Sequence, residues 1–249
     1  MTVADVRAFL IRALTAARTE FVALAALLVA GVGVAAFMEI AGEVNEGDSQ
    51  AFDQAVLSAL RPYADDPARP WGPWWLKEAA GDVTALGGIA VLGLFALIVA
   101  AFLLIQRKWL SSLLLALGLA GGVALSEGLK AVFERERPPA AAQAVETINA
   151  SFPSGHALLS TVFYLSVGVM LTRAFPRRRF KAFVLGVAIL LALLVGLSRI
   201  YLGAHWASDV FAGWAVGAAW AMALWLASYA VAHRQRRAHA TLQDREPSP

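Results

Sequence analysis

The amino-acid sequence predicts an all-α membrane protein whose six transmembrane helices pack as a bundle. Hydrophobic residues make up 59% of the 249-residue chain, and its mean hydropathy is +0.63, whereas a soluble domain is about 45–50% apolar. The apolar residues form continuous runs and do not alternate with polar ones, which favours helical spans over a β-barrel. Neither an internal repeat nor a second domain is visible, so residues 1–249 are interpreted as one integral-membrane domain.

Six apolar runs account for the predicted spans. Helical residues rise about 1.5 Å each, so about 20 of them cross the apolar core of a bilayer, which is about 30 Å thick. The runs that reach or approach this length are residues 21–40, 84–105, 109–129, 156–171, 182–197 and 210–231. Glycines in the third run allow close contact between helices.

The segments outside these runs differ in character. Residues 1–19 carry arginines among apolar residues at helical spacing, which fits either an amphipathic interfacial helix or a simple leader into the first span. Residues 41–82 are acidic and rich in proline, and we expect a short external helix near residues 49–60, followed by tryptophans that anchor helix ends at the membrane interface. Residues 233–249 are charged, end in Pro-Ser-Pro and are expected to be a disordered tail.

The distribution of basic residues predicts the orientation. Arginine and lysine gather in alternate connections, which places those connections in the cytoplasm. These basic segments are the N-terminus, the 106–108 turn, the 172–181 loop and the tail. We therefore expect a multi-pass protein of the cytoplasmic (inner) membrane with both termini inside and an active site on the external face. The net charge of +3 and pI of about 9.5 then reflect orientation and not nucleic-acid binding. The absence of cysteine excludes thiolate metal sites and a cysteine nucleophile.

A first motif joins Lys130, Arg137 and Pro138 at the external end of the third run. The two cations are seven residues apart, about two helical turns, so they could face the same way. Without a neutralising carboxylate on that face, they suit a phosphate, which Arg binds through its planar fork and Lys as a point charge. The alternative is that both only mark a helix end near lipid headgroups.

A second motif reads Pro153-Ser154-Gly155-His156 and indicates a loop that enters a helix. A helix N-terminus offers free N–H groups and a positive dipole end, both of which bind anions. Ser154 adds a hydroxyl group, Gly155 permits close backbone approach, and His156 adds a group that could donate a proton near neutrality. Taken alone, this short motif is a weak signal.

A third motif contains Ser198, Arg199, His205 and Asp209 within an otherwise apolar region. Ionisable groups at membrane depth are costly and are usually functional. His205 and Asp209 are four residues apart, so on a helix the carboxylate could reach the imidazole and leave its other nitrogen free to attack or to accept a proton. A polar contact between helices is the alternative. No grouping of His with carboxylates suggests a metal site, and the three cations fit metal-free phosphoryl transfer.

Together, Lys-x6-Arg-Pro, Pro-Ser-Gly-His and Ser-Arg-x5-His-x3-Asp resemble the motifs of the type 2 phosphatidic acid phosphatase family of membrane lipid phosphatases. The family also includes soluble vanadium haloperoxidases, which six apolar spans argue against. The resemblance implies that His205 forms a phosphohistidine, that Asp209 orients it and that His156 protonates the leaving oxygen. It also implies that no cofactor is needed and that the phosphate oxygens are held by Lys130, Arg137, Arg199, Ser154 and the Gly155 backbone.

Several functions remain open at the level of the sequence. The leading hypothesis is hydrolysis of a lipid phosphate or diphosphate such as undecaprenyl diphosphate, phosphatidylglycerol phosphate or phosphatidic acid. The same pocket could serve a lipid A phosphatase or a phosphotransferase. A non-enzymatic transporter or binder of anionic lipid is a third possibility, although binding alone would not require the His205–Asp209 pair. The oligomeric state is open, because a lipid-facing surface and a dimer face look alike in composition.

Overall fold

The computed structural model describes residues 3–145, 147, 149–172 and 175–243, and it describes side chains between Glu20 and His233 within those ranges. Within the described residues every regular element is a helix. The α-helices are α1 (Val3–Glu46), α2 (Ser49–Leu60), α3 (Trp74–Ala85), α4 (Ile89–Ile105), α5 (Trp109–Phe133), α6 (Gly155–Thr172), α7 (Arg178–Tyr201) and α8 (Ala207–Gln243). The predicted all-α membrane bundle is thus confirmed.

The number of spans agrees with the prediction, although the second span has a different form. By length and composition, five of the described helices can cross a membrane, and α3 and α4, bent by 47° at the break between them, bring the number to six when the pair is counted as one span. The sequence placed this span at residues 84–105, whereas the structure adds a further helix, α3, over the residues directly before it. The chain breaks at Leu86–Gly88, where two glycines interrupt the helix and Gly87 lies against His156 and Val195.

The structure decides between the expectations for both ends of the chain. Residues 3–19 continue directly into the first span as part of α1, which agrees with the interpretation as a leader into that span and not with a separate interfacial helix. Residues 233–243 are helical and belong to α8, so the predicted disordered tail is wrong over that range, and residues 244–249 lie outside the described residues. In both segments no Gly or Pro interrupts a run rich in Ala, Leu and Arg, which favour helix.

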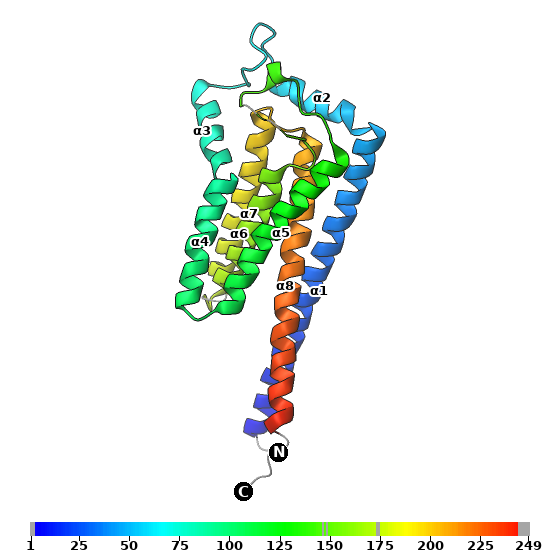
Figure 1. The fold of residues 1–249 in the computed structure, drawn as a ribbon. Coiled ribbons are helices and arrows are strands. Elements are labelled where there is room, and N and C mark those ends of the chain that lie inside the picture. Colours follow the sequence, from blue (N-terminus) through cyan, green and yellow to red (C-terminus); the bar gives the residue numbers. More distant parts are fainter. Residues whose placement is uncertain (1–2, 146, 148, 173–174, 244–249) are drawn as a thin grey trace.

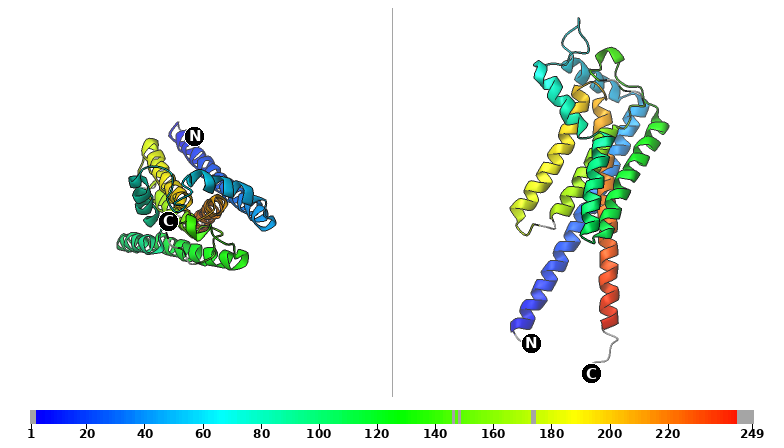
Figure 2. Two further views of the ribbon diagram at one scale, coloured as in Figure 1. Left: turned by 90° about the horizontal axis from the view of Figure 1, so that it is seen from above. Right: turned by 60° about the vertical axis from the view of Figure 1, so that its left-hand side comes forward.

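Helix α6 occupies the centre of the bundle and packs against α5, α7 and α8, while α1 lies along α8. Figure 1 shows that α1 and α8 extend beyond the other helices towards the two termini, and that α2 lies across the opposite end. The right-hand view of Figure 2 shows α1 and α8 again reaching beyond the shorter helices. The loops that follow α5 and α7 gather at the α2 end, where all three sequence motifs lie.

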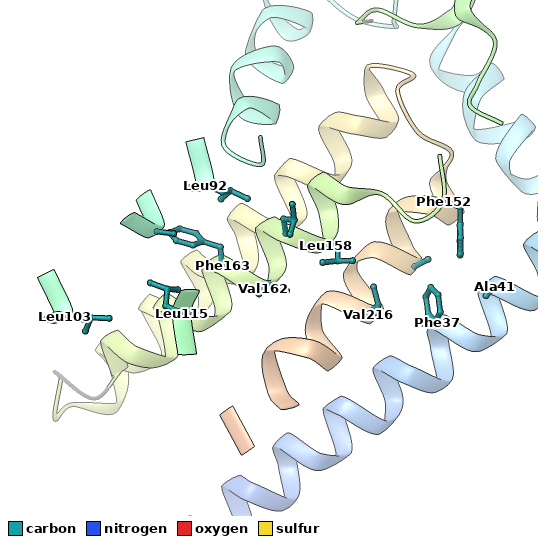
Figure 3. Packing of buried hydrophobic residues seen from close by; sticks show 13 residues of the cluster. Phe37, Ala41, Leu92, Leu103, Leu115, Phe152, Leu158, Val162, Phe163 and Val216 are labelled. Carbon is teal, nitrogen blue, oxygen red and sulfur yellow. The ribbon is translucent and has the colours of Figure 1, made fainter. Parts of the chain in front are cut away.

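A buried aromatic cluster anchors the loop before α6. Phe152 is fully buried and packs on Phe37 of α1, with ring centroids 5.8 Å apart, and on Phe133 of α5, at 4.8 Å. Figure 3 shows Phe152 and Phe37 facing each other at the end of a core that continues through Leu158 and Val162 of α6. The residues that follow Phe152 are therefore held at a fixed depth at the start of α6.

Close backbone contact fixes α8 against the start of α6. A Cβ atom on Gly213 would lie 2.7 Å from the carbonyl oxygen of Ser154, so any larger residue would push the two helices apart. The backbone N–H of Ser154 also donates to the carbonyl oxygen of Asp209 at 2.9 Å. Small residues that allow such approach are a common basis of helix association in membranes.

Candidate active site

A pocket of about 260 Å³ opens at the α2 end of the bundle, where the three motifs meet. Six of the residues predicted from the sequence line it, namely Lys130, Arg137, Gly155, His156, Arg199 and His205. They come from α5, α6, α7 and the loops that follow α5 and α7. The structure therefore brings residues from three distant stretches of the chain to one concave site.

His205 lies in the turn between α7 and α8, not on a helix as the sequence suggested, since α8 begins only at Ala207. Gly203 makes this turn possible with a φ of 69°, a conformation that favours glycine. The predicted contact still forms, because the chain enters α8 at once and Asp209 occupies its first turn. His205 Nδ1 lies 3.3 Å from Asp209 Oδ2.

The two neighbours of the imidazole define its tautomer. His205 Nε2 lies 3.3 Å from Arg137 Nη1, and an arginine nitrogen can only donate a hydrogen bond. Nε2 must therefore accept, which leaves Nδ1 to carry the proton and donate it to Asp209 Oδ2. This arrangement leaves the lone pair of Nε2 on the side of the pocket cations, as a nucleophilic nitrogen requires.

His205 is held in its neutral form. Its side chain is almost fully buried, and this burial, reinforced by the charges of Arg137 and Arg199, lowers the pKa of His205 to about 4 although Asp209 opposes the shift. At neutral pH the imidazole is uncharged, and its nucleophilic lone pair is available.

Asp209 is fully buried and holds a dense set of hydrogen bonds. Its Oδ2 atom accepts the backbone N–H of Trp206 at 2.9 Å and the hydroxyl of Ser151, in addition to His205. Its Oδ1 atom accepts Arg135 Nη1 at 2.6 Å. The bond to Trp206 is half of a capping box, so Asp209 also closes the start of α8.

The three pocket cations have different partners. Lys130 pairs with Glu127 at 2.9 Å, so the expectation that no carboxylate accompanies these cations is wrong for Lys130. Arg137 donates to neutral oxygens, among them the side chain of Asn149 at 2.7 Å and the carbonyl oxygen of Ala204 at 2.6 Å. Arg199 donates to Thr84 at 3.1 Å, and its Nε atom is buried without a partner among the described residues.

The second motif forms the start of α6, as its sequence indicated, with Gly155 as the first helical residue. A Cβ atom on Gly155 would lie 3.1 Å from Ser126 Oγ and 3.6 Å from Lys130 Nζ, so glycine keeps this corner of the pocket open. Ser154, in contrast, is fully buried, is not among the residues that line the pocket, and its hydroxyl oxygen accepts the Ala157 N–H at 3.5 Å. The structure thus brings the Gly155 backbone to the pocket but not the Ser154 side chain.

The remaining motif residues lie behind the pocket and support its loops. Pro138 and Pro153 are fully buried, and the hydroxyl of Ser198 donates to the carbonyl oxygen of Val195 at 2.7 Å on α7. None of the three is among the residues that line the pocket.

Sequence reasoning missed four polar residues that line the pocket, namely Ser126, Glu127, Thr147 and Asn149. Ser126 lies four residues before Lys130 on α5, so helical spacing alone could have placed it on the same face. Arg135 and Asp53, which belong to the network behind Asp209, gave no comparable signal. Across the described residues, no group of three or more His, Asp or Glu side chains is arranged to hold a metal ion.

Comparison with known proteins decides the family. The family model described as "PAP2 superfamily" matches residues 109–232. A phosphatidylglycerophosphatase B from Bacillus subtilis is 31% identical over 182 residues, which cover 73% of this chain and 85% of that protein. This chain belongs to the PAP2 superfamily. An undecaprenyl-diphosphatase from Sulfolobus acidocaldarius is 32% identical over 125 residues, which cover 48% of this chain and 56% of that protein.

Solved structures agree with this assignment. The crystal structure of a transmembrane PAP2-type phosphatidylglycerolphosphate phosphatase from Bacillus subtilis superposes with a TM-score of 0.69 and 29% identity, and covers 78% of this chain and 94% of that one. LpxE from Aquifex aeolicus shares the fold, with a TM-score of 0.54, 22% identity, and coverage of 69% of this chain and 93% of that one. This PAP2 protein is thus a multi-pass membrane phosphatase that acts on lipid phosphates, as the motifs predicted. The hypothesis of a non-enzymatic transporter or binder is not retained.

Proposed function

We propose that this PAP2 phosphatase works through a phosphohistidine on His205, at the external face of the cytoplasmic membrane, and needs no metal ion. Nε2 of His205 attacks the phosphorus of the substrate as the bond from phosphorus to the lipid oxygen breaks. The support for this role is the neutral imidazole, whose Nδ1 proton is held by Asp209 and whose Nε2 lies beside Arg137 in the pocket.

The pocket contains buried hydrogen-bond donors that have no acceptor among the described residues, and this observation carries the proposal. Ser126 Oγ and Arg199 Nε are buried without a partner among the described residues, and both side chains line the pocket. Buried polar groups are almost always paired, and leaving one unpaired costs about 1–3 kcal/mol. Phosphate oxygens supply acceptors only, so a phosphate held by these groups and by Lys130, Arg137 and the Gly155 N–H would satisfy them.

His156 is the second histidine in the pocket and is proposed as the proton donor. It gives its proton to the leaving lipid oxygen when the phosphohistidine forms. It then takes a proton from the water that attacks this intermediate, which releases inorganic phosphate and restores Nε2 of His205. The three cations stabilise the charge on the equatorial oxygens, a role that metal ions fill in many other phosphoryl-transfer enzymes.

For the substrate, we propose phosphatidylglycerol phosphate first and undecaprenyl diphosphate second, with phosphatidic acid as a further candidate. Support comes from the names of the two relatives, of which the phosphatidylglycerophosphatase is covered far more completely than the undecaprenyl-diphosphatase. The likeness to LpxE is at 22% identity and carries the fold only, so it does not bear on the choice of substrate. Transfer of the phosphate to an acceptor other than water stays an alternative outcome.

The test is phosphate release by the purified protein and its His205→Ala variant, in detergent with excess chelator, across these lipids and phosphorylated lipid A. We expect the wild-type protein to release phosphate and the His205→Ala variant to release none. We also expect acid-labile phosphate bound to the wild-type protein during turnover. Substantial release by His205→Ala would remove His205 as the nucleophile. A requirement for added Mg²⁺ would contradict the metal-free mechanism, and the order of the rates would rank the substrates.

A further inference from the structure

Behind the pocket, Arg135 connects two buried carboxylates that come from opposite ends of the chain. Its Nη1 atom donates to Asp209 Oδ1 at 2.6 Å, and its Nη2 atom donates to Asp53 Oδ2 at 2.7 Å. Hydroxyl groups complete the contacts, with Ser208 at 2.7 Å from Nη1 and Ser49 at 3.2 Å from Nη2. The planar guanidinium thus bridges α2 and α8 with two parallel sets of hydrogen bonds.

Because this network is buried, each of its two carboxylates needs the charge of Arg135 as a partner. Asp209 and Asp53 are 0% and 2% exposed, and the Arg135 side chain is 15% exposed. A buried carboxylate that loses its partner is strongly destabilised, because its charge is no longer compensated away from water. Neither Arg135 nor Asp53 is among the residues that line the pocket, so neither is placed to contact the substrate phosphate.

The network decides which way the Asp209 carboxylate faces. Arg135 holds Oδ1, which leaves Oδ2 to accept from Trp206, Ser151 and His205. If Arg135 were absent, the carboxylate could rotate, and the Nδ1–H of His205 would lose a fixed acceptor. The guanidinium also lies 5.9 Å from the ring of Trp206, the residue that follows His205. Arg135 therefore contacts the chain directly after the nucleophile, from Trp206 to Asp209.

Asp53 holds the other side of the network and caps α8 from a distant helix. Its Oδ1 atom accepts the backbone N–H of Ser208 at 3.0 Å, and its Oδ2 atom accepts the Ser208 hydroxyl at 2.6 Å. The first N–H groups of a helix have no partner within the helix. Asp53, 155 residues away in the sequence, supplies that partner in the first turn of α8, which is the turn that carries Asp209.

We propose that Arg135 and Asp53 are positioning residues that hold Asp209 in the orientation that serves His205, which makes the external helix α2 part of the active site. The inference rests on the proposed role of His205 as the nucleophile. Its consequence is that α2 acts on the rate of phosphoryl transfer and not on the binding of the lipid.

The experiment measures kcat and KM with phosphatidylglycerol phosphate, or with whichever lipid the wild-type protein hydrolyses best, for Arg135→Ala, Asp53→Asn and His205→Ala. Small misplacements of a reacting group can cost about 100-fold in rate, so we expect a fall in kcat of about that size for Arg135→Ala. A positioning role leaves KM within about threefold of the wild-type value. Guanidinium ion added to Arg135→Ala should restore part of kcat, and it should restore nothing to His205→Ala.

Asp53→Asn keeps the shape of the side chain and an oxygen for Ser208 but removes the charge that pairs with Arg135, so we expect a smaller loss of kcat at unchanged KM. The matched control is Arg69→Ala, because Arg69 is an exposed arginine of the segment after α2 that stacks on Tyr63 at 4.3 Å. It should keep wild-type kcat and KM.

Three results would overturn the inference. One is a raised KM at unchanged kcat in Arg135→Ala, which would make Arg135 a substrate ligand. Another is an Arg135→Ala variant that elutes as a folded, monodisperse species but whose lost kcat is not restored by guanidinium. If Arg135→Ala does not fold, Asp53→Asn with wild-type kcat would overturn the inference instead. An active His205→Ala would refute the proposed nucleophile, which is a separate and distinguishable outcome.

Discussion

At the scale of single residues, the pocket is defined by groups whose hydrogen-bonding capacity is unfilled. Ser126 illustrates this, because its side chain is 2% exposed and yet its hydroxyl has no partner among the described residues. A hydroxyl in a helix commonly donates to a carbonyl oxygen one turn earlier, as Ser160 and Ser198 do in this protein. Ser126 makes no such bond, and it lies beside Gly155 and Lys130 at the proposed phosphate site.

Ser126→Ala should therefore weaken turnover without harming the fold. A hydrogen bond to a charged group is worth about 1.5–3 kcal/mol, which predicts a loss in kcat/KM of about tenfold or more. The matched control is Ser112→Ala on the same helix, because Ser112 is also buried but donates to Ala100 at 3.2 Å, outside the pocket. Equal kcat/KM values for Ser126→Ala and the wild-type protein would show that this hydroxyl does not contact the substrate.

The protonation state of His205 gives a second prediction at this scale. Burial lowers the pKa of His205 to about 4, whereas an unperturbed histidine titrates at about 6.5. Because the pKa is lowered, the imidazole should stay neutral as the pH falls from 8 to about 5 and become protonated only near about 4. NMR of histidine-labelled protein measures this directly, with His205→Ala used to assign the signal.

The same spectra test the tautomer, because the proton should reside on Nδ1, which faces Asp209. The matched variant Asp209→Asn should disturb this preference. A His205 signal that titrates near 6.5 in the wild-type protein would contradict both the burial of the imidazole and its availability as a neutral nucleophile.

At the scale of elements, the sequence predicted helices well and their boundaries less well. Continuous apolar runs identified all six spans, because the bilayer leaves the backbone few alternatives to a helix. The break between α3 and α4 was not predicted. The helix over residues 233–243 was not predicted either, since polar and charged residues also continue a helix when no Gly or Pro intervenes.

The close packing at the break between α3 and α4 gives a prediction for Gly87. A Cβ atom on Gly87 would clash with Val195 and lie 3.4 Å from Cδ2 of His156. Gly87→Ala should therefore displace His156 or separate α4 from α7, and we expect a lower thermal unfolding temperature together with a lower kcat. The matched control is Gly93→Ala on α4, which meets no atom within 4 Å and should be neutral or slightly stabilising because Ala favours helix.

Melting curves and turnover of the two glycine variants are then compared. If Gly87→Ala and Gly93→Ala behave alike, the close contact at the break does not position His156. If Gly87→Ala keeps its unfolding temperature and loses only kcat, the break serves the geometry of the site more than the stability of the bundle.

At the scale of the whole molecule, the sequence predicted only those site residues that belong to short motifs. Lys130, Arg137, His156, Arg199 and His205 were predicted to converge, and they line one pocket. The Arg135–Asp53 pair could not be predicted, because its members are 82 residues apart and meet only when α2 folds across the end of the bundle. The orientation of the bundle in the membrane, in turn, is predicted from the distribution of charge and not from packing.

That orientation yields the last prediction. The first residues of α1 and the last residues of α8 lie at the end of the bundle opposite α2 (Figure 1), and the 106–108 turn joins α4 to α5 at the end away from the pocket. Because the basic connections should stay in the cytoplasm, we expect the loop after α2 and the pocket to face outwards. The chain has no cysteine, so single cysteines at two exposed positions, Asp65→Cys and Lys108→Cys, give an unambiguous readout in intact cells.

A membrane-impermeant maleimide should label Asp65→Cys in intact cells and Lys108→Cys only after the membrane is opened. Each variant serves as the control for the other, because both residues are exposed and they lie at opposite ends of the bundle. Retained phosphatase activity shows that the labelled protein is correctly inserted. The opposite labelling pattern would place the pocket in the cytoplasm, where His205 would meet phosphorylated lipids of the inner leaflet, and the proposed external site would have to be abandoned while the chemistry of the pocket stood unchanged.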